Sequence, residues 1–170
     1  MNNKTVFYFH GYNSSPNSDK VRRLREVSPD TYAYEIDVDP RISLPFLREA
    51  IRTQLNKEAE KVVFVGTSLG GWYAEKLAGE FDAKCVVINP CYSPSGILLR
   101  HGLPETILDS YADMKLSGTT KFFISSNDEV IDFSPIRDVL MERNTSWFEG
   151  TSHRFNGPEF EAVVDYVREL

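Results

Sequence analysis

Six short apolar runs recur along the chain, and polar or amphipathic segments separate them. They occupy residues 5–9, 32–37, 61–65, 85–89, 121–125 and 145–148. Four of the runs contain nearly continuous hydrophobic stretches, namely VFYF, VVFV, CVVI and KFFI. Such stretches are typical of strands that are buried on both faces of a parallel sheet. The pattern therefore predicts a mainly parallel sheet of about six strands.

The segments between these runs carry helix signals. Ser18 is a candidate N-cap for SDKVRRLREV, and Ser43 is one for SLPFLREAIRTQL, in which Pro45 falls in the first turn. Residues 134–135, Ser-Pro, open another predicted helix, and the last helix is expected over residues 158–167. Apolar positions in these segments recur at helical spacing, so each helix can bury one face against the sheet.

The alternation of strand and helix predicts right-handed crossovers, with helices on both faces of the sheet. Residues 91–120 interrupt this rhythm, because they carry mostly turn chemistry and one short helix near residues 105–112. The chain has no internal repeat, low-complexity tract or linker. We therefore expect a single α/β domain over residues 1–170, in which residues 91–120 form a small cap or lid.

Composition narrows the class of protein. With 170 residues, 41% of them hydrophobic and 26% charged, the chain suits one soluble globular domain. A formal net charge of -6 argues against nucleic acid or an anionic membrane as the main partner. No apolar run is long enough for membrane insertion, and MNNKTVFYFHGY is not typical of a signal peptide. Cys85 and Cys91 are too few for a disulfide framework, so we expect reduced thiols and a cytoplasmic protein.

The sequence GTSLG, residues 66–70, falls where a predicted strand gives way to a predicted helix. A G-x-S-x-G sequence in this context is typical of a nucleophile elbow, in which a strained turn presents the serine hydroxyl. The same glycines also suit a tight turn without chemistry. Gly71 would allow a phosphate-binding loop, but the chain contains neither Gly-Lys-Ser/Thr nor G-x-G-x-x-G. We therefore treat Ser68 as a candidate nucleophile that the rest of the sequence can test.

A serine nucleophile needs a base, and the base needs an acid that orients it. When such a triad stands on a parallel sheet, the acid and then the histidine follow the serine, each after a later strand. Asp128, Glu129 and Asp132 all follow the run at residues 121–125. Asp128 lies nearest the strand end, Glu129 is expected to point outward, and Asp132 suits a cap for the next helix. We favour Asp128 and keep Asp132 as the alternative.

Three histidines could serve as the base: His10, His101 and His153. His153 follows the last predicted strand, so it comes after Ser68 and the acid in the required order. His10 precedes Ser68, and His101 lies within the cap segment. We therefore expect His153 to be the base.

A tetrahedral oxyanion would need two backbone N–H donors beside Ser68. The amide of Leu69, the residue after the candidate nucleophile, is the first candidate. The second should come from the loop after the first strand, HGYNSSP at residues 10–16, where the N–H of Tyr12 is our candidate. Glycine, asparagine, serine and proline also suit a simple chain reversal, so this loop has an ordinary structural explanation as well.

Five segments together resemble one known group of proteins: FYFHGYNSSPNSDK, VVFVGTSLGGWYAEKLA, VVINP, SSNDEVIDF and EGTSHRFNGPEF. They make the chain similar to the α/β-hydrolase superfamily, and within it to the small bacterial YqiA/YcfP-like esterases. The resemblance implies Ser68 as nucleophile, Asp128 as acid and His153 as base, with the His-Gly-Tyr loop at the oxyanion site. It also implies an α/β-hydrolase sheet without the usual antiparallel strands at its beginning. Asn127 departs from the glycine that such proteins often carry before the acid.

The sequence thus predicts a serine hydrolase that cleaves small-molecule carboxylic esters or thioesters without a metal or organic cofactor. A short segment at residues 91–120 favours a minimal cap and an accessible site. An acyltransferase on the same triad and a non-catalytic binding module with this fold are the alternatives, and the oligomeric state is left open. The candidate pocket walls, for which ordinary packing is an equal alternative, are Trp72, Tyr92, Leu98, Leu99 and Leu103.

Overall fold

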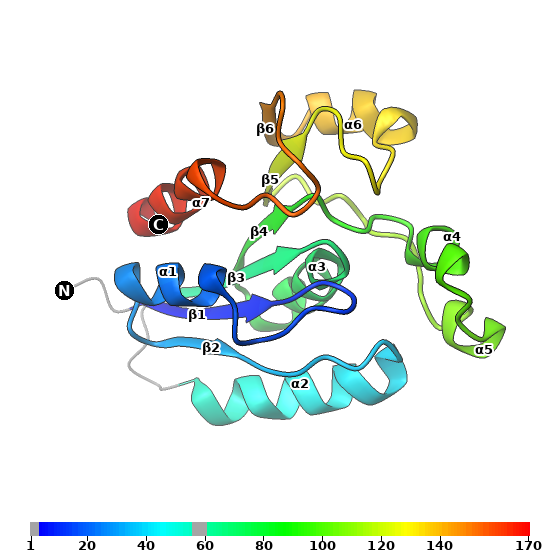
Figure 1. Ribbon diagram of the computed structural model, residues 1–170. Coiled ribbons are helices and arrows are strands. Elements are labelled where there is room, and N and C mark those ends of the chain that lie inside the picture. Colours follow the sequence, from blue (N-terminus) through cyan, green and yellow to red (C-terminus); the bar gives the residue numbers. More distant parts are fainter. Residues whose placement is uncertain (1–3, 56–60) are drawn as a thin grey trace.

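A sheet of six parallel strands forms the centre of the computed structural model, which describes residues 4–55 and 61–170 (Figure 1). Its strand order is β2-β1-β3-β4-β5-β6, and every pair of neighbouring strands is parallel. The predicted parallel sheet is therefore confirmed. The strands are β1 (Lys4–Phe9), β2 (Thr31–Ala33), β3 (Lys61–Thr67), β4 (Lys84–Ile88), β5 (Thr120–Ser125) and β6 (Asn144–Phe148).

Helices cover both faces of this sheet (Figure 1). On one face α1 and α7 lie side by side and pack on the valines of β1 and β3. On the other face α2 and α3 pack on the phenylalanines of the same strands. The alternation of side chains along a strand separates the two sets of residues, so each face has its own apolar core. The helices and 3-10 turns are α1 (Asp19–Val27), α2 (Pro40–Gln54), α3 (Leu69–Phe81), α4 (Pro94–Leu98), η1 (Leu99–His101), α5 (Glu105–Leu108), η2 (Ser134–Ile136), α6 (Arg137–Met141) and α7 (Pro158–Glu169).

Strand β2 ends four residues before the sequence pattern predicts. The apolar run at residues 32–37 continues past Ala33, but its backbone leaves the sheet there. The amide of Ile36 donates a hydrogen bond to Nε2 of His10, 3.1 Å away, instead of extending the ladder with β1. A buried imidazole from the end of β1 therefore competes successfully for this amide.

Helix α2 begins earlier than expected, and Ser43 is not its N-cap. Asp39 caps the helix, because its carboxylate accepts a hydrogen bond from the amide of Arg41 at 2.9 Å. Pro40 occupies the first position, where its fixed φ favours the helix and its missing N–H costs nothing. Ser43 lies inside the first turn and donates from Oγ to the carbonyl of Asp37. Pro45 then falls in the interior of the helix.

The other predicted helix starts agree more closely with the structure. Ser18 caps α1 as expected, with Oγ accepting from the amide of Val21. The Ser134-Pro135 pair opens a 3-10 turn that leads into the short helix α6. Helix α7 starts at Pro158 as expected and runs two residues further, to Glu169. Residues 1–3 and 56–60, which belong to the single domain that the sequence predicts, lie outside the described part of the chain.

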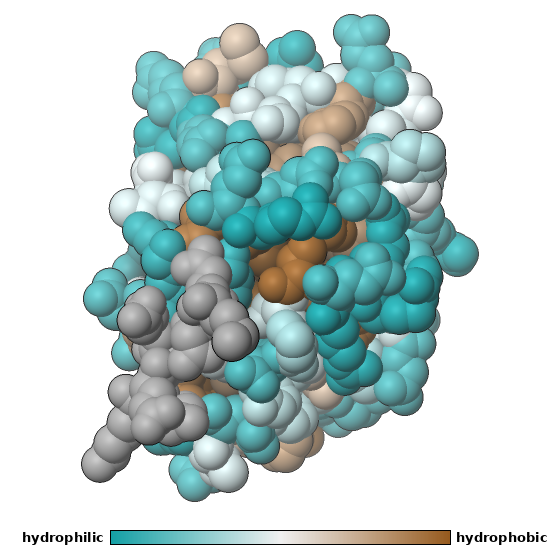
Figure 2. All heavy atoms as spheres, turned by 90° about the vertical axis from the view of Figure 1, so that its left-hand side faces the viewer, coloured by the Kyte–Doolittle hydropathy of each residue, from teal (hydrophilic) through white to brown (hydrophobic). Residues whose placement is uncertain are grey.

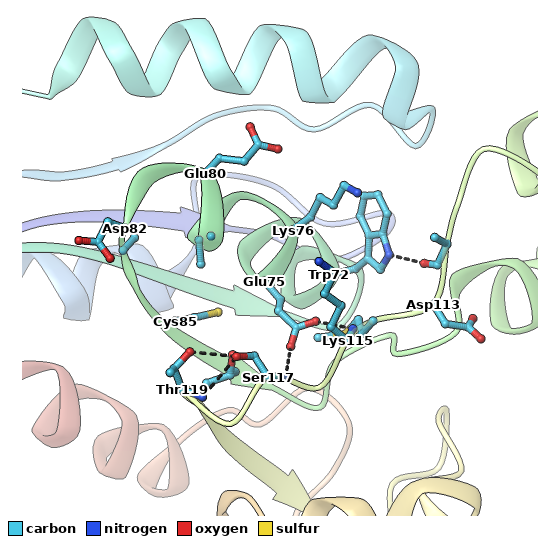
Figure 3. Close-up of a pocket in the computed structure, with 16 residues that line it drawn as sticks. Trp72, Glu75, Lys76, Glu80, Asp82, Cys85, Asp113, Lys115, Ser117 and Thr119 are labelled. Atoms are coloured by element: carbon cyan, nitrogen blue, oxygen red, sulfur yellow. Dashed lines mark hydrogen bonds between the residues drawn. The ribbon is translucent and has the colours of Figure 1, made fainter.

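Residues 91–120 connect β4 to β5 through short helical turns and an extended segment rather than through one long helix. The helix expected near residues 105–112 is shorter and ends at Leu108. The extended part that follows α5, residues 112–117, is called the return segment here; it runs beside α3 and is fastened to it by side chains of that helix (Figure 3). The carboxylate of Glu75 accepts from the amides of Lys115 and Ser117, and the indole N–H of Trp72 donates to the carbonyl of Ala112. Specific hydrogen bonds thus stabilise a segment that contains few regular elements of its own.

The molecular surface is largely hydrophilic on the side from which the strands start. Figure 2 shows this side, on which one recessed apolar area is surrounded by hydrophilic residues. Within residues 4–55 and 61–170, none of the helices has the length and apolarity needed to span a bilayer.

The packing of Phe64 generates a stability prediction. Its side chain is 0% exposed, and its ring meets Phe7 and Phe9 edge to face. We expect Phe64→Ala to lower the free energy of unfolding by about 3–5 kcal/mol, because it leaves a cavity in the core. The matched variant Phe46→Ala removes a side chain that is 51% exposed and should cost about 1 kcal/mol or less. Urea denaturation measures both, and equal losses would contradict the assignment of the core.

Candidate active site

Ser68 occupies a strained turn between the end of β3 and the start of α3. Its backbone has φ 54° and ψ -121°, a region that residues with a side chain rarely adopt. The amide of Ser68 donates to the carbonyl of Ile88, and its carbonyl accepts from the amides of Gly71 and Cys91. Strain of this kind persists only where surrounding contacts enforce it, and it is concentrated at functional sites.

The two glycines of GTSLG are required by close approach of the backbone. A Cβ atom on Gly66 would lie 2.2 Å from the carbonyl oxygen of Gly70. A Cβ atom on Gly70 would lie 2.0 Å from the carbonyl oxygen of Phe9, at the end of the neighbouring strand. Neither position can hold a side chain without displacing backbone. The glycines therefore allow α3 to start directly against β1 and β3, and this fixes the direction of Ser68.

The structure brings Ser68, His153 and Asp128 together in a hydrogen-bonded chain. Nε2 of His153 lies 2.9 Å from Oγ of Ser68, and Nδ1 of His153 lies 2.6 Å from Oδ2 of Asp128. A carboxylate can only accept, so the Nδ1 hydrogen is donated to Asp128 and Nε2 is left to accept from the serine. The side chain of Asp128 is 0% exposed and that of His153 is 13% exposed. This arrangement matches the geometry of a nucleophile, a base and an orienting acid.

Asp128, rather than Asp132, contacts the histidine. Its second oxygen, Oδ1, accepts from the amides of Val130 and Ile131 at 2.8 Å each, which fixes the carboxylate in the loop. Asp132 instead accepts from the amide of Ser134 at 2.9 Å and so caps the following turn. That backbone hydrogen bond also lowers the pKa of Asp132.

Glu129 is exposed, as expected, but it does not simply point outward. Its carboxylate accepts a hydrogen bond from the backbone amide of His153 at 2.8 Å. The local sequence does not reveal this contact, because it arises only where the loop after β6 folds back over the loop after β5. Asp128 and Glu129 thus hold the side chain and the backbone of the same histidine.

Asn89 is a positioning residue that the sequence pattern did not identify. It is 0% exposed and follows β4, which lies between the strands that carry Ser68 and Asp128. Its amide nitrogen donates to Oγ of Ser125 and to the carbonyl of His153, and its amide oxygen accepts from the amide of Ser125. One side chain therefore links the ends of β4 and β5 to the histidine loop. A buried polar residue at the end of an apolar strand was the only available signal.

The loop after β1 passes directly beside Ser68. A Cβ atom on Gly11 would lie 3.2 Å from Cβ of Ser68. Nδ1 of the buried His10 donates to the carbonyl of Gly11, 2.8 Å away, because Nε2 already accepts from Ile36. The C=O of Gly11 and the N–H of Tyr12 belong to one planar trans peptide and point in opposite directions. The hydrogen bond from His10 to this carbonyl therefore also sets the direction of the Tyr12 amide. Leu69, the other expected donor, is the first residue of α3.

A groove of about 580 Å³ leads away from Ser68 and His153. Its walls are residues of the segment 8–23 on one side and of the segment 153–160 on the other. None of the residues 91–120 lines it, so the expectation that this segment shapes the pocket at Ser68 is wrong for this groove. Two contacts of that segment reach the site: His101 packs against Tyr12 with 5.0 Å between the ring centroids, and the amide of Cys91 donates to the carbonyl of Ser68.

A second hollow, of about 570 Å³, lies between α3 and the return segment (Figure 3). Trp72 lines this hollow rather than the groove at Ser68, and so do Glu75 and Cys85. Burial raises the pKa of the Cys85 thiol to about 12, and it does the same to Cys91. Both cysteines are therefore protonated thiols rather than nucleophiles. Of the other expected wall residues, Leu98 is buried in the core and Leu99 is exposed.

In the part of the chain that the structure describes, no cluster of three or more histidine, cysteine, aspartate or glutamate side chains could hold a metal ion. The chemical groups that meet at Ser68 are its hydroxyl, the imidazole of His153 and the carboxylate of Asp128.

The fold is that of the α/β-hydrolases. The esterase Pf2001 of Pyrococcus furiosus superposes with a TM-score of 0.70 at 16% identity, over 98% of this chain and 81% of that chain. XC6422 of Xanthomonas campestris, described as an α/β serine hydrolase without a lid, superposes with a TM-score of 0.61 at 14% identity, over 99% and 79%.

Within this fold the chain belongs to UPF0227, described as an uncharacterised protein family, whose family model matches residues 5–167. The UPF0227 protein YcfP of Escherichia coli O9:H4 is 27% identical over 167 residues, which cover 88% of this chain and 90% of that protein. The resemblance to the YcfP-like group of α/β-hydrolases is confirmed.

Two glycines of α3 provide a matched test of the elbow. Gly70 meets the carbonyl of Phe9, whereas an added Cβ on Gly79 would find nothing within 4 Å. We expect Gly79→Ala to stabilise the protein by about 0.5–1 kcal/mol, because alanine is the better helix residue. Gly70→Ala should lower the stability and disrupt the turn at Ser68. Thermal unfolding of both variants measures the difference, and a tolerated Gly70→Ala would contradict the close approach.

Proposed function

We propose that this protein is a serine hydrolase that cleaves carboxylic esters or thioesters of small molecules. The observation that carries the proposal is the hydrogen-bonded chain Ser68–His153–Asp128, built on a strained turn with an exposed groove beside it. A serine in a simple tight turn would need neither a histidine at 2.9 Å nor a buried carboxylate behind that histidine.

In the first step Oγ of Ser68 attacks the acyl carbon while Nε2 of His153 takes its proton. Asp128 holds the imidazole in the tautomer that accepts this proton and stabilises the imidazolium that forms. The imidazolium then donates the proton to the leaving alcohol or thiol, and an acyl-enzyme remains. In the second step water loses a proton to His153 and attacks the acyl-enzyme, which releases the acid and restores Ser68.

The oxyanion of each tetrahedral intermediate needs hydrogen-bond donors that are fixed in advance. We propose the amides of Leu69 and Tyr12 for this role. Leu69 stands at the N-terminus of α3, where the helix dipole also favours negative charge. The hydrogen bond from His10 to the carbonyl of Gly11 supports the assignment of Tyr12, because it fixes the same peptide unit.

Two neighbouring assignments are less favoured. An acyltransferase would use the same triad, with an alcohol or thiol in place of water, and an open groove admits water freely. A non-catalytic binding module would have no use for the aligned hydrogen bonds at Ser68.

We also propose that the protein functions in the cytoplasm, because its two cysteines are free and buried, which suits a reducing compartment.

The nucleophile can be tested with a fluorophosphonate probe and a short-chain aryl ester. We expect wild type to be labelled and to hydrolyse the ester, and Ser68→Ala to lose labelling and about 10⁴-fold or more of the hydrolysis rate. Labelling is read by mass spectrometry of the tryptic peptide. Equal labelling of the two proteins, or labelling of neither, would contradict the assignment. Unfolding curves for both proteins provide the control for folding.

The acid can be tested with a matched pair of amide variants. Asp128→Asn should lower the rate of ester hydrolysis by about 10³–10⁴-fold, because an amide cannot hold the productive tautomer of His153. Asp132→Asn removes the same charge from the same loop but contacts neither Ser68 nor His153, so its rate should stay close to that of wild type. A larger loss in Asp132→Asn would assign the acid to Asp132 instead.

A further inference from the structure

The groove at Ser68 is cationic although the protein as a whole is anionic. The formal net charge of the chain is -6, yet the groove is lined by three cationic side chains and one carboxylate. The carboxylate, that of Asp19, is paired with Arg22 on the adjacent surface of α1. The cations of the lining are Lys20, Arg23 and Arg154.

Lys20 is held in place without a carboxylate partner. Its Nζ donates to the carbonyl of Arg154 at 2.7 Å and to Oδ1 of Asn156 at 2.5 Å, and it lies 5.5 Å from the ring centre of Phe160. Across residues 4–55 and 61–170, no carboxylate oxygen lies within 4.0 Å of this ammonium group. An ammonium has three N–H donors, and these two contacts use only two of them. A cation that is held in place by neutral partners therefore lines the groove.

The two arginines of the groove differ in whether a carboxylate compensates their charge. The guanidinium of Arg23 forms an ion pair with Glu161 and donates to the carbonyl of Gly157, so its charge is already compensated. Arg154 is exposed, and within the described ranges no carboxylate lies within 4.0 Å of its guanidinium. Lys20 and Arg154 are thus the cations available to a ligand.

The position of these cations relative to His153 identifies the part of the substrate that they would meet. The leaving oxygen of an ester must lie within reach of Nε2 of His153, because that nitrogen donates its proton. The rest of the alcohol therefore extends on the side of the histidine. Arg154 is the next residue along the chain, and Lys20 binds the carbonyl of Arg154 from the opposite wall.

We propose that the preferred substrates are esters whose alcohol part carries an anionic group, a carboxylate or a phosphate, which Lys20 and Arg154 bind. This inference rests on the proposed hydrolase function and specifies its substrate class. The anion would accept one hydrogen bond from the ammonium group of Lys20 and another from the exposed guanidinium of Arg154. It would also be attracted into the groove before binding, because the local charge is opposite to its own.

Three acetate esters of para-substituted phenols provide the test: methyl 4-acetoxybenzoate, 4-acetoxybenzoate and 4-acetoxyphenyl phosphate. The first is neutral, the second carries a carboxylate and the third a phosphate. Each kcat/KM is divided by the rate constant of hydroxide-catalysed hydrolysis of the same ester, which removes differences between the leaving groups. We expect wild type to prefer at least one anionic ester over the neutral one by about tenfold, mainly through KM. The comparison of the last two esters distinguishes carboxylate from phosphate.

Variants assign this preference to the groove. Lys20→Met and Arg154→Gln should each reduce the ratio of anionic to neutral ester about threefold, so that the two losses together account for the preference, and Lys20→Arg should retain most of it. The ratio is internal to each variant, so a general loss of folding or turnover does not change it. Lys76→Met removes the same charge from an exposed position of α3 outside the groove and should leave the ratio unchanged.

The ratio should also fall as the pH rises. Burial lowers the pKa of Lys20 to about 8, against the opposing influence of Asp19 and Glu159, while Arg23 and Arg154 lower it slightly. The ammonium is charged below this pKa and neutral above it. The preference for 4-acetoxybenzoate is therefore expected to be full near pH 7 and to decline through about pH 8, since kcat/KM reports the free enzyme.

The outcomes separate the two proposals. If wild type hydrolyses none of the three esters, the proposed hydrolase function fails. If the neutral ester is hydrolysed with dependence on Ser68, but the corrected ratio is near one, only the anionic substrate class is overturned. A preference that Lys20→Met and Arg154→Gln leave intact would overturn it as well.

Discussion

The rest of the site depends on the close contact between three pieces of backbone at the start of α3. Gly70 lies directly against the end of β1, and Gly66 lies directly against the first turn of the helix. This contact leaves Ser68 no helical or extended conformation, so it adopts a left-handed φ of 54°. The hydroxyl is then presented above the carboxyl ends of the strands, where the loops after β1, β5 and β6 can reach it. The cost of the strained residue is offset by backbone hydrogen bonds to Ile88, Gly71 and Cys91.

The histidine is positioned from several sides, although it stands on a loop. Asp128 binds its ring, Glu129 binds its amide, and Asn89 binds its carbonyl. Two of these contacts come from the loop after β5 and one from the end of β4, so the register of the sheet is transmitted to the imidazole. Preorganisation of this kind is what acyl chemistry requires, because the base must already be aligned when the substrate arrives. Hydrogen bonds thus tie the histidine loop to the ends of the strands beneath it.

The segment 91–120 does not line the groove at Ser68. It packs over α3 and the sheet, fastened by Glu75 and Trp72. It reaches the site through the packing of His101 on Tyr12 and through the hydrogen bond from the amide of Cys91 to the carbonyl of Ser68. The walls of the groove come from the two ends of the chain instead. Helix α1 and the loop before α7 are brought together by their packing on one face of the sheet, and this packing places Lys20 beside Arg154. A cationic groove in an anionic protein is thus a product of the fold.

The sequence alone determined the parallel sheet, the GTSLG turn and the candidates Ser68, Asp128 and His153, because these follow from local patterns and from their order after successive strands. Their catalytic roles stay predictions, but the proximity of the three side chains was foreseeable, since parallel strands end at one edge of the sheet. The tertiary structure alone decided the cap of α2, the early end of β2, the contacts of Glu129 and Asn89 with His153, and the walls of the groove. Each of these depends on partners that are distant along the chain or on competition for a single amide, such as that of Ile36. No periodicity records such contacts, because their energy arises only when the packed elements bring the groups within hydrogen-bond distance.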